Sequence, residues 1–155
     1  MNQFTKAYIE CALRSSTEYQ FGECPCCGNK TRLDHYPEKE FEQVPMCGAE
    51  GCGVTEIPNP EPMDSNYSVS DIHPDTLKRM MDDCRDFQAD NEQALTESEL
   101  SDEQAGHDFW LNRNGHGAGF WDRGLGRVGE TLSAASRACG SFDLYVGDDG
   151  MIHGS

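Results

Sequence analysis

The chain has 155 residues, about the length of one domain, and its 28 Asp and Glu residues against 12 Lys and Arg residues give a net charge of −16. This length excludes a large multidomain enzyme. The charge disfavours direct binding to nucleic acid or to an anionic membrane surface, because both repel an acidic chain.

The N-terminal residues predict a short amphipathic helix. Apolar side chains, among them Phe4 and Tyr8, follow at helical spacing over residues 3–15. Lys6 and Glu10 interrupt the apolar stretch that an export signal would need. No apolar run approaches the ~20 residues required to cross a bilayer. We therefore expect a soluble, cytoplasmic protein without a membrane partner.

Two cysteine motifs predict a zinc ribbon. Two residues separate Cys24 from Cys27, a spacing that lets both thiolates face one ion, and four residues separate Cys47 from Cys52 in the second pair. Four thiolates complete a closed tetrahedral site, which leaves no position for a water molecule, so we expect a structural zinc ion. This module is predicted to span residues 21–60 as an insertion.

Other readings of the cysteine module stay open. The thiols could be free or form disulfides, and Cys26 or His35 could replace one of the four ligands. A zinc ribbon that binds nucleic acid is an alternative function, which would use Lys30, Arg32 and Lys39. Three glutamates lie among these bases and weaken any phosphate contact.

After a proline-rich connector at residues 58–62, a helix is predicted to start near Asp71, with Pro74 in its first turn and Asp75 near its N-terminus. Its apolar residues recur at helical spacing and are expected to face the core. They are Leu77, Met80, Met81, Cys84 and Phe87.

The opposite face of this helix is acidic and is the candidate partner-binding surface. Helical carboxylates rise by ~1.5 Å per residue and duplex DNA carries one charge per ~1.7 Å, so such a face can imitate part of a DNA surface. The alternative is a solvated face that keeps a small protein soluble. The residues selected as candidates for binding a basic protein surface are Asp82, Asp83, Asp86 and Asp90.

Two further helices and a hairpin are predicted in the last third of the chain. Ser101 followed by Gln104 forms a capping-box pattern at a helix start, and a second helix covers residues 128–138. A turn at residues 147–150 between two strand-like runs predicts a terminal β-hairpin. We therefore expect an α+β domain of three or four helices and a hairpin, formed by residues 1–20 and 61–155.

The segment between these helices is rich in residues that can carry chemistry. His107, His116 and Asp122 are candidates for a metal-dependent or acid/base enzyme site. The alternative is a packed corner in which polar residues cap helices and aromatic residues fill the core. Those aromatic residues are Phe109, Trp110, Phe120 and Trp121.

The sequence HDFWLNRNGHGAGFWDRGLG at residues 107–126, with LYVGDDG at residues 144–150, resembles an uncharacterised family of small acidic proteins of tailed bacteriophages. Residues 8–13 and 63–72 are similar to the same family. The first helix leads almost directly to the later block in that family, which implies that the cysteine module is an insertion. The resemblance implies a phage-encoded accessory protein that acts in the host cytoplasm, and it carries over no catalytic residue.

Overall fold

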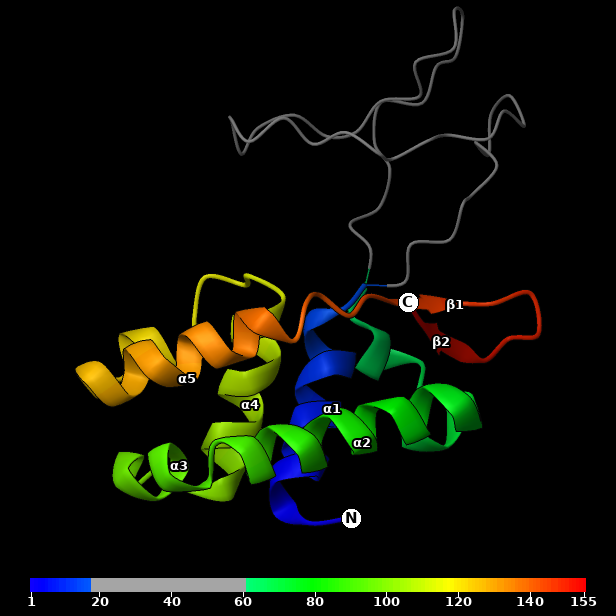
Figure 1. Cartoon of the computed structure of the whole chain (residues 1–155). Coiled ribbons are helices and arrows are strands. Elements are labelled where there is room, and N and C mark those ends of the chain that lie inside the picture. The colour runs from blue at the N-terminus through cyan, green and yellow to red at the C-terminus, as the bar shows by residue number, and fades with distance from the viewer. Residues whose placement is uncertain (18–60) are drawn as a thin grey trace, which may run out of the picture. The chain divides into compact units, whose positions relative to one another are not determined.

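Five α-helices and a C-terminal hairpin make up residues 1–17 and 61–155, the part of the chain that the computed structural model describes (Figure 1). This mostly helical unit with its hairpin agrees with the predicted α+β class. The predicted zinc module and its four ligands lie outside the described residues. These ligands are Cys24, Cys27, Cys47 and Cys52.

The helices predicted from the sequence are confirmed, and one short helix, α3, is added. The α-helices are α1 Gln3–Ser15, α2 Pro74–Asp90, α3 Glu92–Ser98, α4 Asp102–Arg113 and α5 Arg127–Ala138. The strands are β1 Leu144–Val146 and β2 Ile152–Gly154, and three 3₁₀ turns are η1 Met63–Ser65, η2 Val69–Asp71 and η3 Phe120–Asp122.

Side-chain caps fix the start of three helices. The Asn2 carboxamide oxygen accepts a hydrogen bond from the Thr5 backbone N–H at 2.9 Å at the start of α1. The Ser101 hydroxyl accepts one from Gln104 N–H at 3.2 Å, as the capping pattern predicts. His73 caps α2, where Pro74 occupies the first turn. These contacts satisfy backbone donors that have no partner within the helix.

The core lies mainly between α1, α2 and α4 and is rich in aromatic rings. The Phe87 ring of α2 stacks on the Phe109 ring of α4 with 3.9 Å between their centroids. The ring centroid of Tyr8 in α1 lies 5.1 Å from that of Phe109 and 5.2 Å from that of Trp110. All four of these aromatic side chains are buried, so aromatic packing joins the three helices.

A glycine allows α1 and α4 to approach closely. A Cβ atom placed on Gly106 would lie less than 3.0 Å from the carbonyl oxygen of Phe4. Since Gly106 lies within α4 with ordinary helical geometry, its role is to make room for the backbone of α1.

The C-terminal hairpin lies against the N-terminus of α2. Its strands pair antiparallel, with Val146 opposite Ile152, and Ile152 also forms a bridge with Ile72 just before α2. The Gly154 backbone N–H donates to the Thr76 hydroxyl at 3.1 Å. The hairpin is thus an extension of the helical core rather than a separate element.

The chain leaves and re-enters the described unit at neighbouring positions. Thr17 and Pro62 form an antiparallel bridge, and the Met63 backbone N–H donates to the Ser16 carbonyl at 2.9 Å. An inserted module requires the chain to leave and re-enter at adjacent positions of this kind. The assignment of residues 21–60 to a zinc module stays a prediction. Among the helices of residues 1–17 and 61–155, none is long and apolar enough to cross a bilayer.

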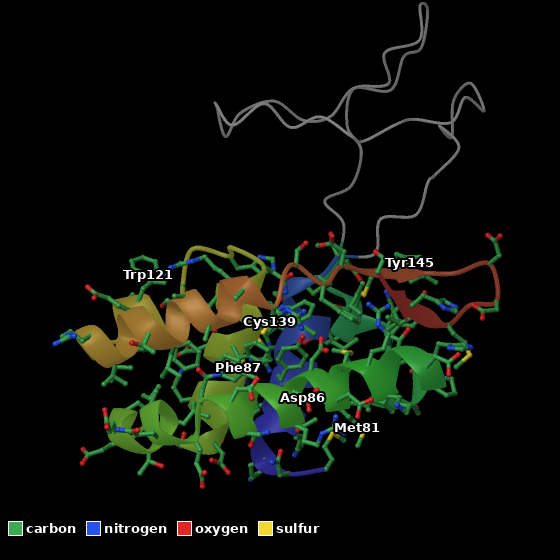
Figure 2. The ribbon with its side chains drawn as sticks, in the orientation of Figure 1. Met81, Asp86, Phe87, Trp121, Cys139 and Tyr145 are labelled. Atoms are coloured by element: carbon green, nitrogen blue, oxygen red, sulfur yellow. The ribbon has the colours of Figure 1, made fainter. Side chains whose placement is uncertain are left out.

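Two side chains expected in the core are exposed. Met81 is 40% exposed because it lies about 100° around α2 from the fully buried Met80. Trp121 is 57% exposed, although the preceding Phe120 is fully buried. Figure 2 shows Trp121 near α5 and Met81 on α2. Cys139 is also exposed, as the residue that follows the last turn of α5.

Substitution of Gly106 tests the close approach of α1 and α4. We expect Gly106→Ala to lower the free energy of unfolding by about 1 to 3 kcal/mol, because the added methyl group forces the two backbones apart. The sign of the change is informative, since replacing glycine by alanine at an exposed helical position would instead raise the free energy of unfolding by about 1 kcal/mol. Urea unfolding followed by circular dichroism measures the change. Glu103→Ala, at an exposed position of α4, is the control.

Candidate functional site

The segment of residues 107–126 is built around a buried carboxylate. Asp108 has no exposed side-chain surface. Arg123 donates to both of its oxygens, from Nη2 at 2.7 Å and from Nε at 2.9 Å, and Gln104 donates to it at 2.9 Å. This bidentate pair joins α4 to the turn after η3 and uses the hydrogen-bonding capacity of Asp108 for structure.

Arg113, at the end of α4, is a second buried charge, with a side chain only 3% exposed. Its Nη1 donates to the Tyr8 hydroxyl at 2.6 Å and to Asp83 at 2.8 Å. Its other nitrogens donate to the carbonyls of Gly140 at 2.8 Å and Cys139 at 3.2 Å, beyond the last turn of α5. Arg113 therefore joins α1, α2, α4 and the end of α5.

Both asparagines of the segment also have structural partners. Ser133 donates from its hydroxyl to the Asn112 side-chain oxygen at 3.1 Å. The Asn114 side-chain oxygen accepts from the Phe142 backbone N–H at 2.8 Å. Gly119 passes so close to Asn112 that a Cβ atom would overlap its side chain. Within residues 1–17 and 61–155, no buried side-chain nitrogen or oxygen lacks a hydrogen-bond partner.

The enzyme alternative receives little support from this segment. Asp122 accepts a hydrogen bond from the Gly119 backbone N–H at 3.2 Å and so closes the η3 turn. His116 is exposed and His107 is half-buried. Among the described residues, His107, His116 and Asp122 do not form a metal-binding group, nor do any other His, Cys, Asp or Glu side chains. The contacts of Asp122 are those of the packed-corner reading.

Burial also suppresses the reactivity of the core thiols and of the buried phenol. Burial raises the pKa of Cys84 to about 12 and that of Cys11 to about 11. It also raises the pKa of Tyr8, which the neighbouring Arg113 opposes. At neutral pH these groups are protonated, so they supply no ready nucleophile.

The four carboxylates selected from the sequence fall into two groups. Asp82 and Asp83 are held by cations of the same unit: Lys78 and Arg85 bind Asp82, and Arg113 binds Asp83. Asp83 lies only about 60° around α2 from the buried Met80, at the edge of the core-facing side, which is why it reaches Arg113. A partner-binding role for Asp83 therefore competes with its structural role.

Asp86 and Asp90 are exposed. Asp86 forms an ion pair with Arg85 at 2.8 Å, and Figure 2 shows it on α2. They begin a run of carboxylates, here called the acidic surface, that continues through α3 into α4 without any Lys or Arg. All its members are exposed. They are Asp86, Asp90, Glu92, Glu97, Glu99, Asp102 and Glu103.

A groove of about 500 Å³ opens within this region, between the end of α2, α3 and α5. Asp90 and Glu97 line it on one side, and Arg127 and Thr131 line it from α5. The groove makes the acidic surface concave at this point. The guanidinium of Arg127 is the one cationic group among the residues that line it with Asp90 and Glu97.

Some carboxylates of the acidic surface stabilise their helices and some do not. Glu92, Asp102 and Glu103 lie in first turns, where the helix dipole favours a negative charge. Glu97 lies in the last turn of α3, where the dipole of that helix disfavours a negative charge. Asp90 ends α2 but directly precedes Asn91, the N-cap of α3, so the two helix dipoles act on it in opposite directions.

Glu99 adds backbone strain at the same end of α3. Its φ is 55°, and it is the one non-glycine residue with positive φ in residues 1–17 and 61–155. The dipole of α3 and this left-handed backbone therefore give no local reason for the acids at Glu97 and Glu99.

Comparisons of the chain with protein-family models, with curated proteins and with solved structures found no match.

A pair of substitutions in α2 separates structural from exposed carboxylates. Asp83→Asn should lower the free energy of unfolding by about 1 to 3 kcal/mol, because it removes the anion that accompanies the buried Arg113. Asp86→Asn, one turn away, should change it by less than about 0.5 kcal/mol, since its ion pair is exposed to solvent. Thermal and urea unfolding measure both. Equal effects of the two variants would contradict the assignment.

Proposed function

We propose that the protein is a non-enzymatic accessory protein of a bacteriophage that binds a basic surface of a host protein through its acidic surface. The observation that carries this proposal is the run of seven exposed carboxylates over residues 86–103, a stretch of the sequence that contains no Lys or Arg. The phage origin and the host cytoplasm as its location come from the resemblance of residues 107–126 and 144–150.

DNA mimicry is the specific form of this proposal. A basic channel that binds DNA recognises closely spaced negative charges on a rigid support. The acidic surface offers such charges on helices α2, α3 and α4, which the core holds in fixed positions. A host protein that handles DNA is therefore the class of partner that fits best.

The placement of Glu97 and Glu99 supports a binding role. Carboxylates at helix C-terminal ends and at a strained backbone position lower stability slightly, and such costs are typical of residues retained for function. Carboxylates needed only for solubility could lie anywhere on the exposed surface.

A charge-neutral variant tests the proposal. The variant carries Asp86→Asn, Asp90→Asn, Glu97→Gln and Glu99→Gln. We expect it to lose capture of the host partner from an uninfected bacterial lysate. It should unfold at the same temperature as wild type or higher, because all four side chains are exposed and the charge of Glu97 opposes the dipole of α3. Duplex DNA added to the lysate should compete with wild-type capture, as should raised salt.

The control variant removes the same number of charges from other exposed positions. It carries Glu61→Gln, Glu130→Gln, Asp143→Asn and Asp148→Asn. Because both variants change the net charge equally, loss of capture in the first alone assigns binding to the acidic surface. Equal loss of capture by both variants would show that net charge alone determines binding. Full capture by the first variant would reject the proposal.

We further propose that Cys24, Cys27, Cys47 and Cys52 bind one structural zinc ion. The support is the spacing of the two cysteine pairs, which matches closed four-thiolate sites. Zinc would then supply folding free energy to a module too short to obtain it from apolar burial.

Single serine substitutions test the ligand set. We expect Cys27→Ser to lose zinc, as measured by elemental analysis of the purified protein, while Cys26→Ser retains a full equivalent. The two variants are closely matched, because Cys26 and Cys27 are adjacent in the sequence and each loses one thiol. Retention by Cys27→Ser together with loss by Cys26→Ser would show that Cys26 is the ligand instead.

A further inference from the structure

The groove between α3 and α5 is lined by charges of both signs. The two helices pack against each other, at the left of Figure 1. Asp90 and Glu97 line the groove from α2 and α3, and Arg127 lines it from α5. Its volume of about 500 Å³ lies within the range of about 300 to 1,000 Å³ that is typical of ligand sites.

The charges of the groove are not neutralised by neighbouring side chains. Elsewhere on α2, Asp82 and Asp83 form ion pairs with cations of the same unit. Among residues 1–17 and 61–155, by contrast, Asp90, Glu97 and Arg127 form no ion pair. Opposite charges that line one groove without meeting leave each of them available to a complementary group from outside.

Helix dipoles add to this separation of charge. Glu97 lies in the last turn of α3, whose dipole favours a cation there, and Arg127 is the first residue of α5, whose dipole favours an anion. No side chain caps the start of α5. Each of the two residues therefore carries the charge that its own helix end disfavours. A cation beside Glu97 and an anion beside Arg127 would relieve both conflicts.

The groove also has an apolar part. Ala94 of α3 and Val128 of α5 line it, and both are half-buried against the core. The methylene groups of a long charged side chain cover apolar surface of this kind while its charged head stays in water. Asn91 and Thr131 add groups that donate and accept hydrogen bonds.

We propose that the groove binds a segment of the host partner that carries one basic and one acidic side chain. The basic side chain pairs with Asp90 and Glu97 and lays its methylene groups on the apolar part of the groove. The acidic side chain pairs with Arg127. This inference rests on the proposed function and refines it, because Arg127 repels a second cation and so selects against an uninterrupted run of basic residues.

Titration of the full chain with two synthetic peptides tests the assignment by nuclear magnetic resonance. Both are helix-forming, with acetylated and amidated ends. The first carries one Arg and one Glu about four residues apart, on one helix face, and the second carries Gln in place of that Glu. We expect the methyl signals of Ala94, Val128 and Thr131 to shift with the first peptide, which should bind about two- to fivefold more tightly than the second.

This preference is diagnostic because the protein has a net charge of −16. Net charge alone would favour the peptide without Glu. Arg127→Gln should abolish the preference for the Glu peptide, since it removes the cation that the acid meets. Equal binding of the two peptides by wild type, or an undiminished preference in Arg127→Gln, would overturn the proposal.

Two variants of α5 locate the bound peptide. Thr131→Phe fills the groove from an exposed position without changing the charge, and threonine and phenylalanine have similar helix propensities. Ala134→Phe places the same ring at an exposed position of α5 that does not line the groove. Both should keep the wild-type circular dichroism spectrum. Binding of the first peptide should be lost in Thr131→Phe alone, and retention there would overturn the proposal.

Failure of the groove assignment and failure of the proposed function give different results. If only the groove assignment is wrong, Thr131→Phe still captures the host partner from a lysate while the charge-neutral variant does not. If the proposed function is wrong, the charge-neutral variant captures it as well.

Discussion

The buried guanidinium of Arg113 is the interaction on which the arrangement of the helices depends. A charge removed from water costs several kcal/mol unless it is fully paired, so its partners must be brought to one point. Tyr8, Asp83 and the carbonyls of Cys139 and Gly140 come from three other parts of the chain to satisfy it. The guanidinium also lies 5.4 Å from the ring centroids of Phe109 and Phe142. Packing and charge thus specify the same geometry, and a shift of α1, α2 or α5 relative to α4 would leave Arg113 without one of its partners.

The helices could be predicted because their signals are local, whereas their contacts could not. The cap of Ser101, the proline in the first turn of α2 and the spacing of apolar residues in α1 depend only on near neighbours in the sequence. Helix α3 was missed because its seven residues include only two apolar ones, Ala94 and Leu95, which give a weak periodic pattern. The pairing of Asp83 with Arg113 joins residues 30 positions apart, and only the packed structure brings them together.

The segment of residues 107–126 shows how a structural block can resemble a catalytic one. It concentrates His, Asp, Arg and Trp, the residue types that enzymes use, but Asp108, Asn112 and Arg113 direct their polar groups into the protein. Burying polar groups demands exact partners, and close backbone approach demands glycine. A sequence that meets both demands becomes rich in functional-looking residues. Exposure distinguishes a structural block from a catalytic one: Asp108, Asn112 and Arg113 are buried, whereas His116 and Trp121 are exposed. The sequence alone does not indicate which of these residues face solvent.

Carboxylates that serve only solubility should lie at positions where they do not destabilise the fold. Glu92, Asp102 and Glu103 meet this expectation in the first turns of α3 and α4. Glu97 lies in the last turn of α3, where the dipole disfavours an acid and no basic residue compensates, whereas Asp90 ends α2 but directly precedes the N-cap of α3. Glu99 occupies a left-handed conformation that asparagine or glycine would adopt with less strain. Glu97 and Glu99 thus have no local stabilising role, and the proposed basic partner would supply a reason for their presence that solvation alone does not.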